Sequence, residues 1–470
     1  MASPSLLVHI CKNISLLLLS LLLLPLTSAI ALSSLLYTNL FPVKPAALWV
    51  GERKTILVSS LAMCKGLCIA RALHLSGHRV IGVDVKRLLV PSAGRFSASL
   101  SAYYEVDYPK TPGKAYERQI VEIVKKEGVD VWICVSDIAT TVEDALAKET
   151  VEAETGCKVF IPSVDACRAM DDKHSFIEHA EGIGLQVPET VLVASGREAL
   201  EFLGPKTNGK QKFILKSVAI DDETRSDMTL LFPRATWQDT ESRIGRLPIT
   251  PDNPWVIQEL ISGAEYCSHA AVVNGVVTAF VACPSSDLLM SYRPLPLSHP
   301  AASQLLDLTR EHARTLDGGR VTGQLAFDVL LADDGRGIFP IECNPRTHTA
   351  IVLFSQTPAA LAEAYLSLLN PRHKEPALVD CERTRPVYWL GHDIVSLILA
   401  PVLLHFRLPD VKTFITHLLF WKDGIYEVWD PLPMWWLYHV YWPAAFIESL
   451  YLGKRWSRIN VSTTRIFGWL

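Results

Sequence analysis

Residues 323–350, GQLAFDVLLADDGRGIFPIECNPRTHTA, constrain this chain most, because they predict a β-hairpin with two carboxylates on one face. An apolar-rich run, an Asp-Asp-Gly-Arg-Gly turn and a second run ending in Glu-Cys-Asn-Pro-Arg are typical of two antiparallel strands. If the turn is centred on Gly335, Asp328 and Glu342 each lie seven residues from the centre and are opposite each other. Asn344 then faces the same way. A β-bulge would shift this pairing by one residue.

Two adjacent carboxylates repel each other unless a cation lies between them. A hard divalent ion such as Mg²⁺ prefers oxygen ligands, would remove the repulsion and would bind the phosphates of a nucleotide. Arg346 follows in the sequence and offers a fork-shaped guanidinium for an anion beyond the metal. The alternative is a solvated hairpin face without an ion. The Asn-Pro-Arg and the apolar flanking residues favour the metal site.

Ahead of the hairpin, buried strands alternate with helices. KTILVSS, HRVIGVDV and VDVWICVSD predict strands, and CKGLCIARALHLSG and KAYERQIVEIVKKEG predict helices. This alternation predicts a parallel, doubly wound α/β sheet over residues 52–163, followed by an α+β domain over residues 164–370. Asp84 and Asp137 end two strands, where such sheets bind ligands, but a helix cap or a turn explains either equally well. No GxGxxG follows the first strand, so a dinucleotide site is not supported.

Two lysines of the second domain suit a phosphate. Lys173 lies in DDKHSF and Lys216 ends the strand-like run FILKS, and each is a compact point charge. Taken alone, either lysine is more often a solvated surface residue. The charged residues 217–230, which include Arg225, form either a lid over the phosphates or a plain surface loop.

A strand-like run, WVIQELI, predicts a contact to a base. The backbone of Gln258, Glu259, Leu260 and Ile261 suits the edge of an adenine with apolar neighbours on its faces, although the tetrapeptide is weak evidence alone. Glu265 adds a carboxylate for a ribose hydroxyl or for the phosphate and metal region. A surface salt bridge is its alternative.

The order of these segments resembles the ATP-grasp superfamily, in which a small α/β domain precedes two spaced lysines, a hinge and an acidic hairpin ending in E-x-N-P-R. The resemblance implies ATP and Mg²⁺, or Mn²⁺ in its place, as cofactors. It implies Asp328, Glu342 and Asn344 as metal ligands, Lys173 and Lys216 as nucleotide lysines, Gln258 to Ile261 as the adenine hinge and Arg346 as the active-site arginine. The charged segment after Lys216 departs from the glycine-rich pattern of the superfamily.

Within the superfamily the chain is most similar to the mycosporine-glycine synthase type and to related fungal secondary-metabolite (fumisoquin-type) ligases. The similarity includes the hydrophobic N-terminus, QELISGAEYCSH, IECNPRTH and DPLP with its aromatic tail. His269 and His348 belong to these motifs, and each is either a substrate contact or a structural residue. The resemblance implies a ligase that phosphorylates a carboxylate or enol oxygen of a small acceptor and joins it to an amino acid through a C–N bond. An ATP-binding membrane-associated scaffold and a doubly wound oxidoreductase are the alternatives.

The net charge and the cysteine pattern argue against several other classes of protein. The 470 residues carry a net charge of −4 without a basic block, which argues against nucleic acid as a partner. The ten cysteines form no CxxC or His-spaced pair, which argues against a zinc site or disulfide framework and for reduced cytosolic thiols.

The two ends of the chain are apolar. No charged residue lies between Lys12 and Lys44, and this segment is long enough to cross a bilayer. Three interpretations are open: a membrane anchor at residues 1–51 with the catalytic body in the cytosol, a cleaved signal peptide, and a helix buried against the C-terminal region. We expect the anchor.

Eight of the twelve tryptophans lie from Trp389 onward. Residues 371–470 therefore predict either a membrane-docking surface or a compact subdomain on the N-terminal helix. The resemblance to secondary-metabolite ligases implies other enzymes of a biosynthetic cluster as partners.

Overall fold

The computed structural model describes residues 6–42, 52–107, 114–138, 140–206, 211–217, 231–285, 290–370, 375–405 and 408–468. The first unit is the predicted doubly wound sheet, parallel throughout, with the strand order β3-β2-β1-β4-β5. Its strands are β1 (Thr55–Ser59), β2 (Arg79–Val85), β3 (Ala102–Val106), β4 (Val131–Ile133) and β5 (Lys158–Phe160). Helix α2 (Cys64–Leu75) packs on one face, and α3 (Lys114–Glu127) and α4 (Thr141–Glu154) pack on the other.

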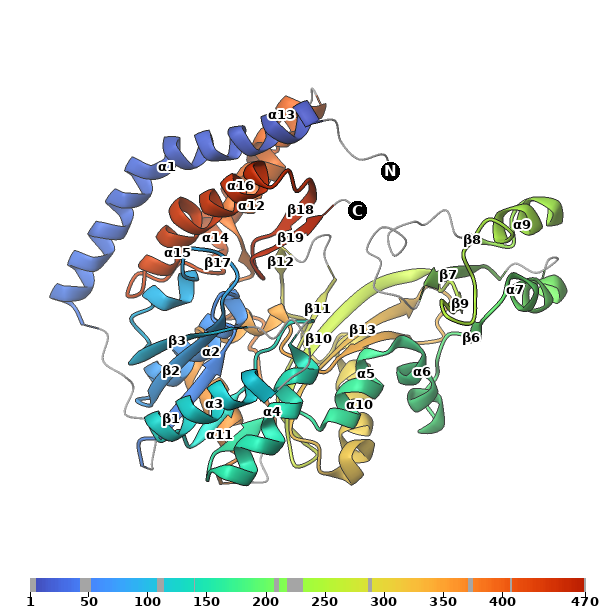
Figure 1. Cartoon of the computed structure of the whole chain (residues 1–470), viewed down its shortest axis with the longest axis horizontal. Helices are drawn as coiled ribbons and strands as arrows, with labels where there is room; N and C mark the ends of the chain where they lie inside the picture. The colour runs from blue at the N-terminus through green and yellow to red at the C-terminus, as the bar shows by residue number, and fades with distance from the viewer. Residues whose placement is uncertain are drawn as a thin grey trace.

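Two further sheets follow, of which the smaller is antiparallel and the larger is antiparallel except where β15 pairs parallel with β11. The smaller has the order β6-β9-β7-β8, and the larger has the order β14-β13-β10-β11-β15 (Figure 1). The strands of the smaller sheet are β6 (Thr190–Val193), β7 (Phe213–Ser217), β8 (Leu231–Phe232) and β9 (Trp255–Glu259). Those of the larger sheet are β10 (Gly263–Val273), β11 (Val276–Pro284), β13 (Gly323–Ala332), β14 (Ile338–Asn344) and β15 (Ala377–Leu378).

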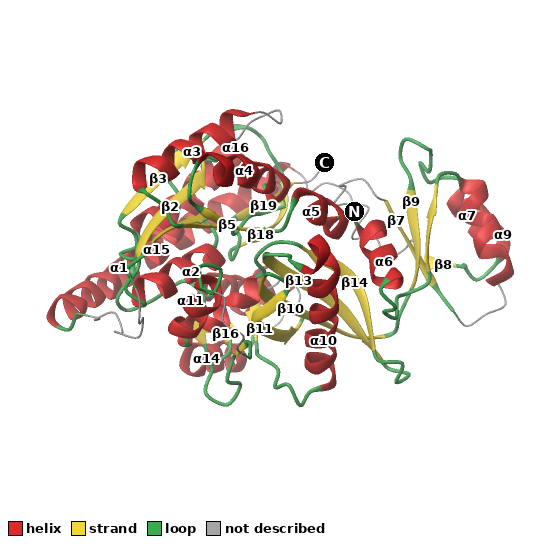
Figure 2. Ribbon diagram, turned by 90° about the horizontal axis from the view of Figure 1, so that it is seen from below, coloured by secondary structure: helices red, strands yellow, loops and turns green. Residues whose placement is uncertain are grey.

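Helices cover these sheets in an α+β arrangement. In Figure 2 the smaller sheet and its two helices form a lobe at one end of the molecule. The helices are α5 (Val164–Asp171), α6 (Lys173–Gly182), α7 (Gly196–Leu203), α9 (Trp237–Ile244), α10 (Pro300–Thr315), η5 (Thr349–Gln356) and α11 (Pro358–Leu366). Both α11 and η5 contact β10 and β11 and also α2, so they join the larger sheet to the first unit.

The C-terminal residues complete the main core. Trp389, Leu437 and Trp442 are buried in the same cluster as Ile56 of β1 and Cys267 of β10. The elements are β12 (Ser291–Tyr292), β16 (Val387–Tyr388), α12 (Leu390–Asp393), η6 (Ile394–Leu399), α13 (Ala400–His405), α14 (Val411–Phe420), β17 (Lys422–Asp423), α15 (Leu432–Trp436), η7 (Leu437–Tyr441), α16 (Trp442–Tyr451), β18 (Trp456–Asn460) and β19 (Arg465–Gly468). The core therefore crosses the domain boundary expected at residue 371, and that boundary stays a prediction.

One described helix, α1 (Leu6–Leu40), is long and apolar enough to cross a membrane by length and composition. It packs along one side on α15, η7 and α16 (Figure 1). The N-terminal helix thus lies against the C-terminal region, as one of the three interpretations proposed. Much of its surface nevertheless remains exposed.

Candidate functional site

The hairpin of β13 and β14 brings the predicted carboxylates together. Asp328 lies directly opposite Glu342, and Ala326 lies opposite Asn344. Side chains two residues apart on a strand share a face, so Asn344 lies on the same side of the sheet as the two carboxylates. The Asn344 amide donates a 3.4 Å hydrogen bond to Asp328 Oδ2, so the three predicted oxygen ligands are neighbours.

The turn itself differs from the prediction. Val329 pairs with Pro340, so the turn is centred between Asp334 and Gly335 rather than on Gly335. The register then shifts between Asp328 and Val329, which restores the pairing of the carboxylates. A bulge, which contributes one extra residue on one strand, produces this shift. The predicted centre of the turn was therefore wrong, but the bulge compensates for it, so Asp328 and Glu342 are opposite each other as predicted.

Crowded negative charge marks this face of the hairpin. Burial, together with the nearby carboxylates of Glu342 and Glu265, raises the pKa of Asp328 to about 8, against the opposing effect of Lys173 and Arg346. Lys173, at the start of α6, places Nζ 2.8 Å from Glu342 Oε2. Three carboxylates near one lysine and one arginine leave room for further positive charge, and the carboxylate and amide oxygens fit Mg²⁺.

Arg346 lies at the end of the same strand pair and is buried. Its Nη1 donates a 2.5 Å hydrogen bond to Asp171 Oδ1, and its Nη2 donates to Asn344 Oδ1. Asp171 ends α5, so the loop after β14 is tied to the helix that precedes Lys173. The predicted arginine is thus held beside the predicted ligands by an aspartate that the sequence did not indicate.

The second lysine lies on the smaller sheet. Lys216 of β7 donates a 3.1 Å hydrogen bond to Gln258 Oε1 on β9, and Gln258 donates a 3.3 Å bond to Thr190. The backbone amide of Glu259 donates to Glu189 O and that of Leu260 donates to Lys212 O, each at 2.7 Å. These two amides are engaged within the sheet and are not available to a base.

Glu265 is exposed on β10 and accepts a 2.7 Å hydrogen bond from Ser285. It lies two residues before Cys267, which pairs with Asp328, so it projects from the carboxylate face. Ile261, the last residue of the predicted hinge, is buried between the two sheets in a small cluster with Ala332 and Phe339.

Solved structures with the same arrangement of sheets identify the fold. N5-carboxyaminoimidazole synthetase from Staphylococcus aureus, in complex with ADP, superposes with a TM-score of 0.52 over 73% of this chain and 84% of that chain, at 12% identity. The chain has the ATP-grasp fold. The ADP complex of PurK, N5-carboxyaminoimidazole ribonucleotide synthetase, superposes with a TM-score of 0.50 over 71% and 80% of the two chains, at 13% identity. No protein-family model matches the sequence, and no curated protein matches it.

Within the ATP-grasp fold, a lysine of the first unit reaches the hairpin. Lys65, in the first turn of α2, is buried and donates a 2.5 Å hydrogen bond to Thr347 O. Burial, together with the positive charge of Arg346, lowers its pKa to about 7. The sequence carried a signal for it, because Lys65 follows the first strand of a parallel sheet, at the edge where ligands bind.

His269 and His348 lie close to each other and to the charge of Lys65. His348 caps η5 by accepting from Ala350 N, and His269 Nδ1 accepts from His348 N at 3.3 Å. Burial, with the charges of Lys65 and Arg346, lowers the pKa of His348 to about 3, so its imidazole is neutral. Both histidines accept hydrogen bonds from backbone amides, which favours the interpretation of each as a structural residue.

A mixed donor group overlaps the carboxylate site. Ligand atoms of Cys267, Asp328 and His348 lie within 4.8 Å of one another. The thiol of Cys267 is buried, and a hydrogen bond with Cys283 together with burial raises its pKa, so the thiol stays protonated. A protonated thiol is a poor ligand, and the oxygen set of Asp328, Glu342 and Asn344 remains the better match to a hard cation.

The two strand-end aspartates of the first unit hold local structure. Asp84 accepts from Ala62 N, Ser92 and Tyr103. Asp137 pairs with Arg87. These contacts join separate segments of the first unit and give both aspartates a structural role there. Arg225 and the rest of the predicted lid, residues 218–230, lie outside the described residues.

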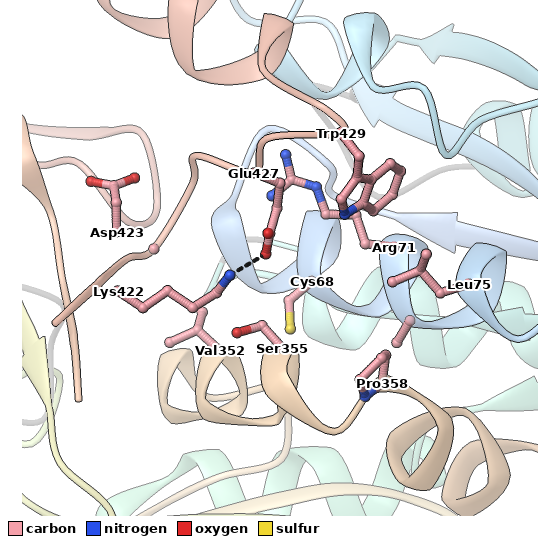
Figure 3. Close-up of a pocket in the computed structure, with 12 residues that line it drawn as sticks. Cys68, Arg71, Leu75, Val352, Ser355, Pro358, Lys422, Asp423, Glu427 and Trp429 are labelled. Carbon is pink, nitrogen blue, oxygen red and sulfur yellow. Dashed lines mark hydrogen bonds and ion pairs between the residues drawn. The ribbon is translucent and has the colours of Figure 1, made fainter. Parts of the chain in front are cut away.

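A small cavity lies where the three parts of the chain meet (Figure 3). It measures about 50 Å³ and is lined by α2, η5 and the residues around β17, with Arg71, Ser355 and Glu427 among its polar groups. That volume holds one or two waters and excludes a nucleotide. The hairpin face, rather than this cavity, is the candidate site.

Proposed function

We propose that this protein is an ATP- and Mg²⁺-dependent ligase that joins a small-molecule acceptor to an amino acid through a C–N bond. The opposition of Asp328 and Glu342 beside Lys173, within an ATP-grasp fold, carries the proposal. Asp328, Glu342 and Asn344 would hold Mg²⁺, which would neutralise the triphosphate. Both similar structures described above contain ADP, which supports a nucleotide site.

The residues divide the reaction between them. Lys173, Lys216 and Arg346 would stabilise charge while the γ-phosphoryl group moves to a carboxylate or enol oxygen of the acceptor and ADP leaves. The amine of the amino acid then attacks the activated carbon, the C–N bond forms, and inorganic phosphate leaves with the acceptor oxygen. Positioning and electrostatics suffice, so no covalent protein nucleophile is needed.

The base would rest on the segment between the two sheets. Because the amides of Glu259 and Leu260 are engaged, Ile261 and the carbonyl groups of Gln258 to Ile261 are the groups proposed to contact adenine. Glu265 would bind the ribose or the phosphate and metal region. Arg225 is proposed as an anion contact of a lid.

The acceptor would enter from the side of the first unit. Lys65 joins α2 to the loop after Arg346, so it lies at the junction of the two units and next to the charge that the reaction develops. Replacing Lys65 with Met should raise the KM for the acceptor several-fold more than the KM for ATP. Steady-state kinetics with each substrate varied in turn would measure both, and an equal rise in the two constants would contradict this role.

We place the enzyme in secondary metabolism, as the mycosporine-glycine synthase resemblance implies, with a body in the cytosol, membrane association and other enzymes of a biosynthetic cluster as partners. Catalytic turnover of ATP distinguishes the proposed ligase from a scaffold. A scaffold would bind ATP without releasing ADP, and an oxidoreductase would purify with nicotinamide or flavin absorbance.

The test is ADP release by the full-length protein over a panel of amino acids and acceptors. We expect Glu342→Gln to reduce ADP release at least 100-fold, because a carboxylate ligand is lost while the fold stays intact. Glu382→Gln, at an exposed position, is the control and should retain full activity. Undiminished turnover by the Glu342 variant would refute the assignment.

A further inference from the structure

The inner side of α1 carries polar residues that bond to the C-terminal region. Asn13, Ser20, Thr27 and Ser34 recur every seven residues, which is close to two helical turns and places them on one side. Trp456 donates to Asn13 at 3.1 Å, Ser20 donates to Tyr438 O at 2.8 Å, Thr27 is 2.6 Å from His439 Nε2, and Ser34 is 2.7 Å from the Tyr426 hydroxyl. These four polar side chains therefore face the protein.

The outer side is apolar and exposed. Leu18, Leu22 and Leu26 are 60%, 76% and 61% exposed, and Leu32 and Leu36 continue the series at 62% and 64%. A helix on a water-soluble protein has the opposite polarity, with its apolar stripe toward the core. A contiguous apolar surface of this length exceeds what a monomer usually leaves in water.

The absence of charged residues from the outer face of α1 suits contact with the hydrocarbon of a bilayer. No residue between Lys12 and Lys44 is charged, so no ion on this face would lose its hydration on entering a bilayer. The neighbouring helix α16 adds the exposed side chains Ile447, Tyr451 and Leu452. Glu448 of α16 and the nearby Lys454 are partly exposed beside these side chains and form an ion pair at 4.0 Å. An aromatic and aliphatic surface bordered by charge at one end matches the boundary between head groups and acyl chains.

The contacts also fix the orientation of α1. Lys12 donates to Ser457 O at 3.0 Å near one end, and Thr38 donates to Val428 O at 3.2 Å near the other. These residues are roughly 39 Å apart along the axis. A helix that is held to its own protein over this length lies along the body and cannot leave it to cross a bilayer alone.

We propose that α1 lies in the plane of a phospholipid bilayer and docks the protein there through its outer face, without spanning the membrane. This is independent of the proposed ligase activity. The occupant of the face is lipid rather than a second copy of the chain, because exposed apolar residues run along the whole of α1 and no charged residue follows Lys12 in this helix to form the rim of a protein interface.

Depth measurements on the full-length protein bound to phosphatidylcholine vesicles test this. Nitroxide labels would be placed one at a time at Leu18, Ser20, Leu22, Leu26 and Leu36 in a background with Cys11 and Cys381 replaced by Ser. For a helix in the plane, the four leucine positions share one shallow depth, and Ser20 is shielded. For a spanning helix, depth would change along the roughly 27 Å between positions 18 and 36 regardless of the side, and that result would overturn the proposal.

A paired variant tests the surface itself by vesicle flotation. Leu22→Glu with Leu26→Glu should weaken binding roughly tenfold or more, because two exposed leucines no longer enter the bilayer. Leu192→Glu, on β6 at the other end of the molecule in Figures 1 and 2, is the control and should float like the wild type. Wild-type protein that stays out of the vesicle fraction, or that covers this face by forming a dimer in solution, would also overturn the proposal.

Discussion

At the residue scale, the site depends on carboxylates whose negative charge is partly balanced by neighbouring positive side chains. Asp328 and Glu342 face each other, and Lys173 and Arg346 supply the nearby positive charge. Asp171 and Lys65 were not indicated as site residues, yet the first orients Arg346 and the second lies beside it. Both act through contacts between distant parts of the chain.

Asp84 gives a pH-dependent contribution to stability. Burial raises its pKa to about 6 from 3.8, so the folded protein binds more protons than the unfolded chain between those values. The contribution of Asp84 to the free energy of unfolding should therefore fall as pH rises from about 4 to 6, by up to roughly 3 kcal/mol, and stay constant above that range.

Urea unfolding across this pH range would measure the effect. Asp84→Asn should flatten the slope between pH 4 and 6, whereas Asn at the exposed Asp252 should leave it unchanged. An unaltered slope in the Asp84 variant would show that another group is responsible.

At the scale of single elements, close backbone contact places Lys65. A Cβ at Gly66, in the first turn of α2, would lie 2.5 Å from Ser60 O. Only glycine lets the helix start this close to the end of β1, and that approach directs Lys65 toward the loop after β14.

We expect Gly66→Ala to destabilise the protein by about 1–3 kcal/mol, since backbone must move to relieve the contact. Gly156→Ala is the matched control, because its Cβ would meet nothing within 4 Å. Chemical denaturation of the two variants would compare them, and equal midpoints would argue against a close contact.

At the scale of the whole molecule, the C-terminal region belongs to the body that forms the site. Arg71 of α2 bonds to Asp430 at 2.8 Å and to Ile425 O at 2.7 Å, and Asp430 also accepts from Ala98 N. This buried pair joins residues 359 positions apart in the sequence.

Asp430→Ala should cost about 3–5 kcal/mol of unfolding free energy, because Arg71 would be left buried without its partner. Lys125→Ala, which breaks the exposed pair with Glu154, should cost at most about 1 kcal/mol. Denaturant titration distinguishes these outcomes. A small loss at Asp430 would mean that the C-terminal region packs without this pair.

The sequence alone determined the alternation of strands and helices and the presence of the hairpin, because periodicity and turn chemistry act over neighbouring residues. The bulge that brings Asp328 opposite Glu342 appeared only in the structure. It also indicated an apolar N-terminal helix. Only the tertiary structure decided that Asp171 holds Arg346, that Lys65 reaches Thr347 and that the polar side of α1 bonds to the C-terminal region. These contacts join residues 175, 282 and 418 positions apart, and side-chain packing rather than local pattern selects them.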